Sequence, residues 1–247
     1  MPLEVHHLRL SQSERIVWLL EELKLPYDLH IYDRDLKSGL APQDLKGINP
    51  FGTAPYFRDT NVSPPVSLSE SGAIVEYILQ VYGSKEPSSN GGARLLRTPD
   101  DKEYGEYLEW LHFANGSLQP SAGRIMILSF SGLSNDNPIY KAMSARMSSH
   151  FKFVDDRLAN NRYLAGEQLS AADIMTVFTL TTMRGFVPML DVGPYSNVLR
   201  YLKDVAERPA YQEALKKGEN GMAPMNTPRV KGYAQFEAFR PLLEKYQ

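Results

Sequence analysis

The stretch from Asn49 to Gly83 constrains the fold most, because it joins a proline-bearing loop, two short apolar strands and an amphipathic helix. The apolar residues of the helical part recur at helical spacing and predict one buried face: Ile74, Val75, Ile78, Leu79 and Tyr82. The helix opens at Ser69-Glu70-Ser71, where free backbone N–H groups and the positive dipole end suit a carboxylate. A cis bond between Ala54 and Pro55 would turn the Ala54 backbone outward, where an extended peptide could pair with it.

The residues before this stretch alternate between strand and helix patterns. A strand over Leu3–Leu8, a helix in SERIVWLLEELKL and a strand over Tyr27–Tyr32 predict a right-handed βαβ unit. A short helix around Pro42–Lys46 follows, and then strands around Tyr56-Phe57 and Val66–Leu68 precede the helix from Ser71. The order βαβ-α-ββα predicts an α/β domain over residues 1–84.

The second half of the chain has a different composition. Residues 85–101 are rich in Gly, Pro and Ser, which is typical of a linker that runs over the surface. Residues 102–247 have helical periodicity and predict an all-helical domain with an irregular tail from about residue 218. The expected helices are Lys102 to about Ser131 with an interruption near Gly116–Gly123, Asn135 to about Asn160, a helix from Ser170, Pro194–Glu207, Pro209–Lys217 and Phe236–Tyr246. Ser170 and Asp173 predict a capping box.

Composition excludes several classes of function. The chain has 247 residues, a formal net charge of -2 and no cysteine, so disulfides, thiolate metal sites and a cysteine nucleophile are excluded. The near-neutral charge argues against a nucleic-acid partner. No apolar run reaches the ~20 residues that cross a bilayer, and no signal peptide is recognisable, so we expect no membrane association and a cytoplasmic location.

Ser11 is the sharpest chemical candidate, because it follows the first strand at the start of the first helix. A hydroxyl there can donate a hydrogen bond to a bound thiolate, which the helix dipole also stabilises. A structural alternative exists, since Ser11-Gln12-Ser13-Glu14 fits the S-x-x-E capping box. Ser13 is a second candidate for the thiolate donor.

These motifs together resemble the glutathione S-transferase superfamily, and most of all its fungal and bacterial Gtt-type, theta-like members. The resemblance rests on HHL, WLLEEL and LSESGAIVEYI in the first domain, and on YLAGEQLSAADI and RPAYQEAL in the second. It implies a thioredoxin-like first domain with a cis-proline at Pro55. It also implies an enzyme of detoxification that conjugates glutathione, its co-substrate, to small hydrophobic electrophiles, with peroxidase activity as a further expectation. No metal is implied.

The resemblance also assigns roles to residues. Ser11, four residues before Arg15, corresponds to the active serine of serine-type members, and the glutathione-binding set is Ser11, Gln12, Ala54, Pro55, Glu70 and Ser71. Many relatives carry a lysine where this chain has Thr53, which leaves Arg34, Lys37 and Gln43 as candidates for the glycyl carboxylate. Tyr107 and Leu111 are expected to line the electrophile pocket.

Other functions and the assembly also follow as expectations. The alternatives to a general transferase are a binding or regulatory module with little catalysis, and a dedicated glutathione-dependent isomerase or biosynthetic enzyme. We expect a homodimer, with Phe51 either inserted into the partner subunit or folded back onto its own domain. The five histidines predict no metal site, because His6 and His7 face opposite sides of a strand and His30, His112 and His150 are isolated.

Overall fold

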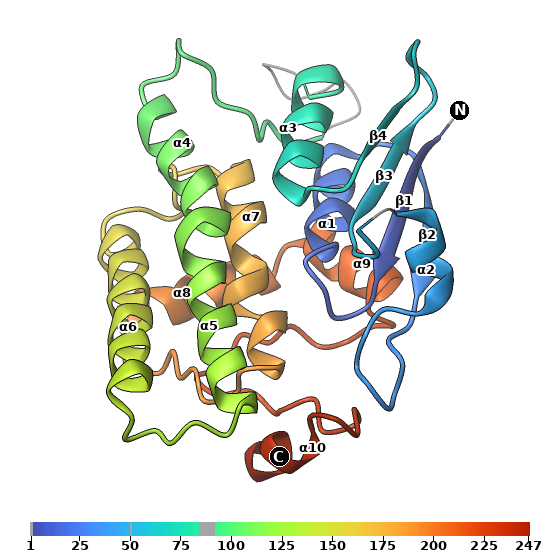
Figure 1. Cartoon of the computed structure of the whole chain (residues 1–247). Coiled ribbons are helices and arrows are strands. Elements are labelled where there is room, and N and C mark those ends of the chain that lie inside the picture. The colour runs from blue at the N-terminus through green and yellow to red at the C-terminus, as the bar shows by residue number, and fades with distance from the viewer. Residues whose placement is uncertain (1, 50, 84–91) are drawn as a thin grey trace.

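The computed structural model describes residues 2–49, 51–83 and 92–247. Its N-terminal part contains β1 (Leu3–Leu8), α1 (Glu14–Leu23), β2 (Tyr27–Tyr32), α2 (Gln43–Ile48), β3 (Tyr56–Asp59), β4 (Val66–Leu68) and α3 (Ser71–Val81). The strands form one mixed sheet in the order β2-β1-β3-β4, with β1 parallel to β2 and antiparallel to β3 (Figure 1). The predicted βαβ-α-ββα domain is confirmed.

The C-terminal part is helical, as predicted. It contains α4 (Tyr104–Phe113), a π-helical segment (Ala114–Leu118), α5 (Gln119–Phe130), α6 (Pro138–Leu158), α7 (Ala171–Leu180), a 3-10 turn (Thr182–Gly185), α8 (Ser196–Ala206), α9 (Pro209–Gly218), α10 (Arg240–Leu243) and a final 3-10 turn (Glu244–Tyr246). The predicted capping box of α7 is confirmed, since both of its hydrogen bonds form between Ser170 and Asp173. No helix of the described residues has both the length and the apolar character that crossing a membrane requires.

The expected interruption of the first long helix lies at its π-helical segment, earlier than the sequence indicated. Pro120 lies in the first turn of α5 and cannot donate a backbone hydrogen bond, so the regular α-helical pattern breaks one turn before it. The wider turn brings Asn115 and Gln119 toward α1, where both contact Arg15. Such π segments are frequent at functional sites.

Helix α1 joins the two parts of the molecule. All its residues except Glu21 are buried. The sequence indicated burial of one apolar face only. The sheet covers one side of the helix and the helical domain covers the other: the Trp18 ring packs at 4.8 Å from Tyr211 of α9, and Glu22 pairs with Arg208 at 2.6 Å. The functional residues at its N-terminus therefore lie between the two parts.

The chain from residue 92 to 101 also contacts both parts. The Ala93 N–H donates to Glu22 of α1, and the Leu95 carbonyl accepts from Ala171 at the start of α7. Residues 85–91 of the expected linker lie outside the described residues.

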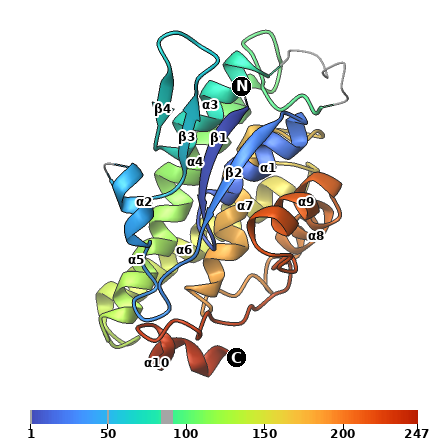
Figure 2. The same ribbon diagram turned by 90° about the vertical axis from the view of Figure 1, so that its right-hand side faces the viewer.

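The C-terminal tail returns to the first domain. Buried Arg184 donates to three tail carbonyls, those of Met225, Thr227 and Pro228, and backbone bonds then join the tail to the loop after β2. Figure 2 shows this tail, with α10, below that loop. The expected helix Phe236–Tyr246 is shorter, because α10 begins at Arg240, with Pro241 in its first turn.

Candidate active site

A cavity of about 430 Å³ lies where the first domain, the helical domain and the tail meet. Its polar side is formed by Ser11, Gln12, Lys46, Thr53, the Ala54 position and Gln119. Its apolar side is formed by Leu10, Met126, Phe178, Met183, Phe186 and Phe239. A site with one polar and one apolar side suits a polar ligand that is held next to a hydrophobic one.

Ser11 and Ser13 occupy different positions relative to this cavity. Ser11 is 6% exposed and lines the cavity, whereas Ser13 is 0% exposed and lies behind it. The Ser13 Oγ lies within hydrogen-bond distance of the N–H and the carbonyl of Leu8, at 3.1 and 3.2 Å. Of the two candidate serines, Ser11 is therefore the one that a ligand in the cavity can reach.

The alternative interpretation of Ser11 as part of a capping box is wrong. Helix α1 begins at Glu14 with Ser13 as its N-cap residue, and the Ser11 Oγ accepts from the Ser13 N–H at 3.2 Å. The Glu14 carboxyl does not reach back to Ser11, because it bonds Thr182 of the helical domain. Burial first, and then the charge of Glu219, raises the pKa of Glu14 to about 8, so this carboxyl holds a proton at neutral pH.

Two residues behind Ser13 were not recognised as a pair in the sequence. The His7 Nδ1 lies 2.8 Å from the Ser13 Oγ, and its Nε2 lies 3.1 Å from a Glu219 carboxylate oxygen and 3.2 Å from the Gly218 carbonyl. Glu219 also accepts from the Leu10 N–H at 2.9 Å. The sequence predicts no role for His7, and Glu219 lies in the tail expected to be irregular, so no local pattern joins the two residues.

Arg15 is a second residue whose importance the sequence understated. It is buried, and its guanidinium donates to Gln12, Ser71, Asn115 and Gln119 at 2.7–3.1 Å. Burial lowers the pKa of Arg15 to about 9, so the group stays charged at neutral pH. No carboxylate pairs with it among residues 2–49, 51–83 and 92–247, which leaves a positive charge beside the cavity wall.

The predicted glutathione-binding residues differ in whether they are free to bind a ligand in the cavity. The cis Ala54-Pro55 bond is confirmed, and a second cis bond, Ser63-Pro64, was not predicted. In the described parts of the chain, no hydrogen bond involves the Ala54 backbone. The Ser71 Oγ is buried and accepts from Arg15 and Asn115, whereas exposed Glu70 lines a separate hollow with Asn115.

Lys46 is the cation that the sequence analysis missed. It lines the cavity with Thr53, whereas the candidates Lys37 and Gln43 are exposed and lie outside the cavity lining. Arg34 lines the cavity too, but it donates to the carbonyls of Arg9, Leu10 and Gly39. Its guanidinium is therefore committed to holding the loop.

The tail completes the apolar side of the cavity. Phe239 lies over Gly39, whose φ is +70°, and a Cβ there would meet the Phe239 ring at 2.4 Å. Glycine is thus required for both the backbone conformation and the close approach. Phe239 also packs on Phe130 of α5, with ring centroids 4.8 Å apart.

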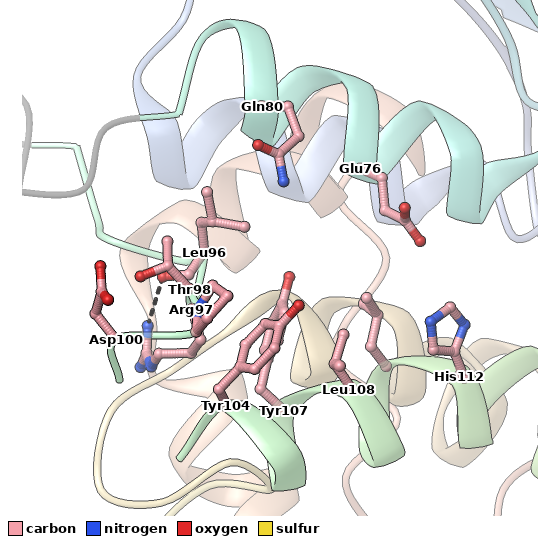
Figure 3. Close-up of a pocket in the computed structure, with 12 residues that line it drawn as sticks. Glu76, Gln80, Leu96, Arg97, Thr98, Asp100, Tyr104, Tyr107, Leu108 and His112 are labelled. Atoms are coloured by element: carbon pink, nitrogen blue, oxygen red, sulfur yellow. Dashed lines mark hydrogen bonds between the residues drawn. The ribbon is translucent and has the colours of Figure 1, made fainter. Parts of the chain in front are cut away.

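Tyr107 and Leu111 line another hollow, between α3 and α4, and not the cavity beside Ser11. Figure 3 shows Tyr104 and Tyr107 rising from α4 toward α3, which carries Glu76 and Gln80. Neither Tyr107 nor Leu111 borders the Ser11 cavity, so the structure does not support their predicted role in lining the electrophile pocket.

The histidines are arranged partly as predicted. His6 and His7 do face opposite sides of β1, but His30 is not isolated, because its ring stacks on His6 at 4.6 Å. Glu4, His6 and His30 bring one ligand atom each within 4.8 Å of one another. The His6 Nδ1 bonds the Tyr32 hydroxyl at 2.9 Å, and we assign no metal to this group.

Comparison with protein families gives two matches that cover most of the chain. The family model described as "Glutathione S-transferase, N-terminal domain" matches residues 5–87. The model described as "Glutathione S-transferase, C-terminal domain" matches residues 116–209. Glutathione S-transferase 3 of Schizosaccharomyces pombe is 34% identical over 232 residues, which are 87% of this chain and 88% of the relative.

Solved structures agree with these sequence matches. A glutathione S-transferase from Actinobacillus pleuropneumoniae superposes with a TM-score of 0.75 at 29% identity, covering 88% of this chain and 93% of the other. A glutathione transferase from Burkholderia graminis, with two glutathione molecules bound per subunit, has a TM-score of 0.67 at 23% identity. The alignment with it covers 89% of this chain and 90% of the other, and the likeness shows the fold alone.

Proposed function

Because the chain belongs to the glutathione S-transferase superfamily, we propose that the cavity beside Ser11 binds glutathione and conjugates it to small hydrophobic electrophiles. The observation that carries this proposal is the position of Ser11. Ser11 is the serine that lines the cavity, in whose lining the apolar side chains of Phe178, Met183 and Phe186 also stand. A thiol held there would lie beside both a hydrogen-bond donor and an apolar co-substrate.

The polar side of the cavity offers partners for two parts of the tripeptide, and the start of α3 beyond it offers one for the third. The unpaired backbone of Ala54 suits the cysteinyl residue, and Lys46 suits the glycyl carboxylate. The γ-glutamyl end then points toward Ser71 and Glu70 at the start of α3. Arg15 holds the Ser71 hydroxyl at 3.1 Å, and its charge favours a carboxylate at this helix start.

The chemistry follows from stabilising a thiolate. Ser11 donates its hydroxyl hydrogen to the sulfur anion, and a hydrogen bond to a charged group is worth ~1.5–3 kcal/mol. The thiolate attacks the electrophilic carbon, a carbon–sulfur bond forms, and a leaving group such as halide departs with its electron pair. With a hydroperoxide, two glutathione molecules would yield the disulfide, an alcohol and water.

We also propose that the protein is a two-fold homodimer, the commonest form of homo-oligomer. Phe51 is 74% exposed, so the alternative that it folds back onto its own domain is wrong. An exposed aromatic side chain in the loop before Pro55 is suited to insertion into a partner subunit.

The test is glutathione calorimetry combined with turnover of an aryl halide and a hydroperoxide. Binding together with turnover of either substrate is the expected result. Binding without turnover of any electrophile in a broad panel would favour the regulatory module. Absence of glutathione binding would refute the proposed function.

A further inference from the structure

A chain of four buried side chains ends at the cavity. The Ser11 Oγ lies 2.7 Å from the Ser13 Oγ, which lies 2.8 Å from the His7 Nδ1. The His7 Nε2 lies 3.1 Å from a Glu219 carboxylate oxygen. Ser11 lines the cavity, and the other three groups lie behind it.

The partners of His7 fix where its protons lie. Among the described residues, its Nε2 faces two acceptors and no donor, the carboxylate of Glu219 and the carbonyl of Gly218, so this nitrogen must carry a hydrogen. A neutral imidazole then presents Nδ1 as an acceptor, 2.8 Å from the Ser13 Oγ. The Leu8 carbonyl, at 3.2 Å, competes for the Ser13 hydroxyl, and the shorter contact assigns its hydrogen to Nδ1.

The two serine hydroxyls must donate their hydrogens in the same direction along the chain, toward His7. Two oxygens 2.7 Å apart share a hydrogen. Since the Ser13 hydrogen points to His7, the shared hydrogen comes from Ser11. Ser11 therefore offers a lone pair to the cavity while His7 is neutral, which suits a thiol that donates but not a thiolate that accepts.

We infer that His7 receives the thiol proton of bound glutathione through Ser11 and Ser13, an inference that rests on the proposed function. The S–H bond breaks and the proton joins the Ser11 Oγ, while the former Ser11 hydrogen moves to the Ser13 Oγ. The former Ser13 hydrogen moves to the His7 Nδ1. The products are a thiolate, an imidazolium beside the Glu219 carboxylate, and a Ser11 hydroxyl that now donates to the sulfur.

Both end states satisfy the groups along the chain. The Ser13 N–H donates to the Ser11 Oγ, and the Leu8 N–H donates to the Ser13 Oγ, in either direction of the hydroxyls. Only the hydrogens between the heavy atoms change sides. His7 touches the substrate through the serines alone, so it is a positioning residue for the Ser11 hydrogen.

An imidazolium formed by this transfer would face the Glu219 side chain. Glu219 is the carboxylate in contact with it, whereas nearby Glu14, with a pKa of about 8, keeps its proton at neutral pH. Burial raises the pKa of Tyr211 and Tyr233 well above the ordinary value, so both phenols stay neutral. Arg34 interacts with Glu219 from the loop after β2, while its N–H groups bond backbone carbonyls.

The decisive experiment counts protons in the wild-type protein. Glutathione is titrated into the protein at about pH 8, close to the ordinary pKa of ~8.5 of a free thiol. Buffers of different ionisation enthalpy report the protons released, and ultraviolet absorbance reports the thiolate. We expect thiolate formation without net proton release to the buffer. Release of one proton for each thiolate formed would overturn the inference and leave the proposed function standing. If glutathione does not bind, both fail.

Variants provide a second readout. His7→Gln and Glu219→Gln are expected to bind glutathione with affinity within about twofold of wild type, yet to lose about tenfold in kcat/KM near pH 7, which higher pH restores. His6→Gln, on the opposite face of the same strand, should keep the wild-type pH profile. A wild-type profile in both His7→Gln and Glu219→Gln would refute the relay. If His7→Gln does not fold, Glu219→Gln and the wild-type proton count decide.

Discussion

Replacing Glu14 with glutamine should stabilise the protein, and the gain should depend on pH. Glu14 is buried between α1 and the helical domain, and its pKa is raised from 4.5 to about 8. The folded state therefore keeps a proton that the unfolded chain loses. Stability from this group is fully present below pH 4.5 and is lost as the pH rises toward 8.

The size of the effect follows from the shift. Each pH unit between the two pKa values costs ~1.4 kcal/mol, so about 4 kcal/mol is lost by about pH 7.5. Glutamine is uncharged in both states and can still bond the Thr182 hydroxyl. We expect Glu14→Gln to match wild type near pH 4 and to exceed its free energy of unfolding by roughly 2–4 kcal/mol near pH 7.5.

Denaturant unfolding at a series of pH values measures this difference. Glu109→Gln, an exposed glutamate on α4, is the matched control and should show a small difference without this trend. A difference between Glu14→Gln and wild type that stays constant from pH 4 to pH 8 would show that burial of this carboxyl is not the cause.

Three further predictions concern the ligand and the assembly. Ser71→Ala should weaken glutathione binding by ~1–2 kcal/mol in calorimetry, because a hydrogen bond to a charged group is lost. Unchanged affinity would remove Ser71 as an anchor, and Ser67→Ala, at the exposed position of β4, is the control. Lys46→Gln should raise the glutathione Kd about tenfold, since one charge-assisted bond is lost; an equal loss for exposed Lys37→Gln would argue for general electrostatics instead. Phe51→Ala should raise the dimer dissociation constant at least ~30-fold in sedimentation, as expected for an aromatic hot spot. A wild-type protein that is monomeric at micromolar concentration would refute the dimer. A variant that dimerises as tightly as wild type would refute only the role of Phe51.

The sequence predicted the elements whose signals are local. The strand and helix periods of residues 3–32, the capping box of Ser170 and Asp173, and the opening of α3 at Ser71 depend on neighbours along the chain. The cis bond before Pro55 followed from the family resemblance, because few X–Pro bonds are cis otherwise. The resemblance favours Ser11 over Ser13 by its spacing to Arg15, but the residues alone leave Ser13 as an alternative.

The missed features depend on contacts between distant parts of the chain. Glu219 reaches His7, and Arg15 reaches Asn115 and Gln119 across the domain boundary. The capping box at Ser11 failed because Thr182 provides Glu14 with a partner in the helical domain. No periodicity or spacing encodes such partners, which appear only once the two domains are packed together.

The central claim is that Ser11 lowers the pKa of the bound glutathione thiol. The most direct measurement is a pH titration of the thiolate absorbance of glutathione bound to wild type and to Ser11→Ala. In the wild-type protein the pKa of the bound thiol should lie one or two units below its ordinary value of ~8.5. Ser11→Ala should return it toward that value, with turnover about 10–100-fold lower and little change in affinity. A bound thiol that titrates identically in both proteins would contradict the account.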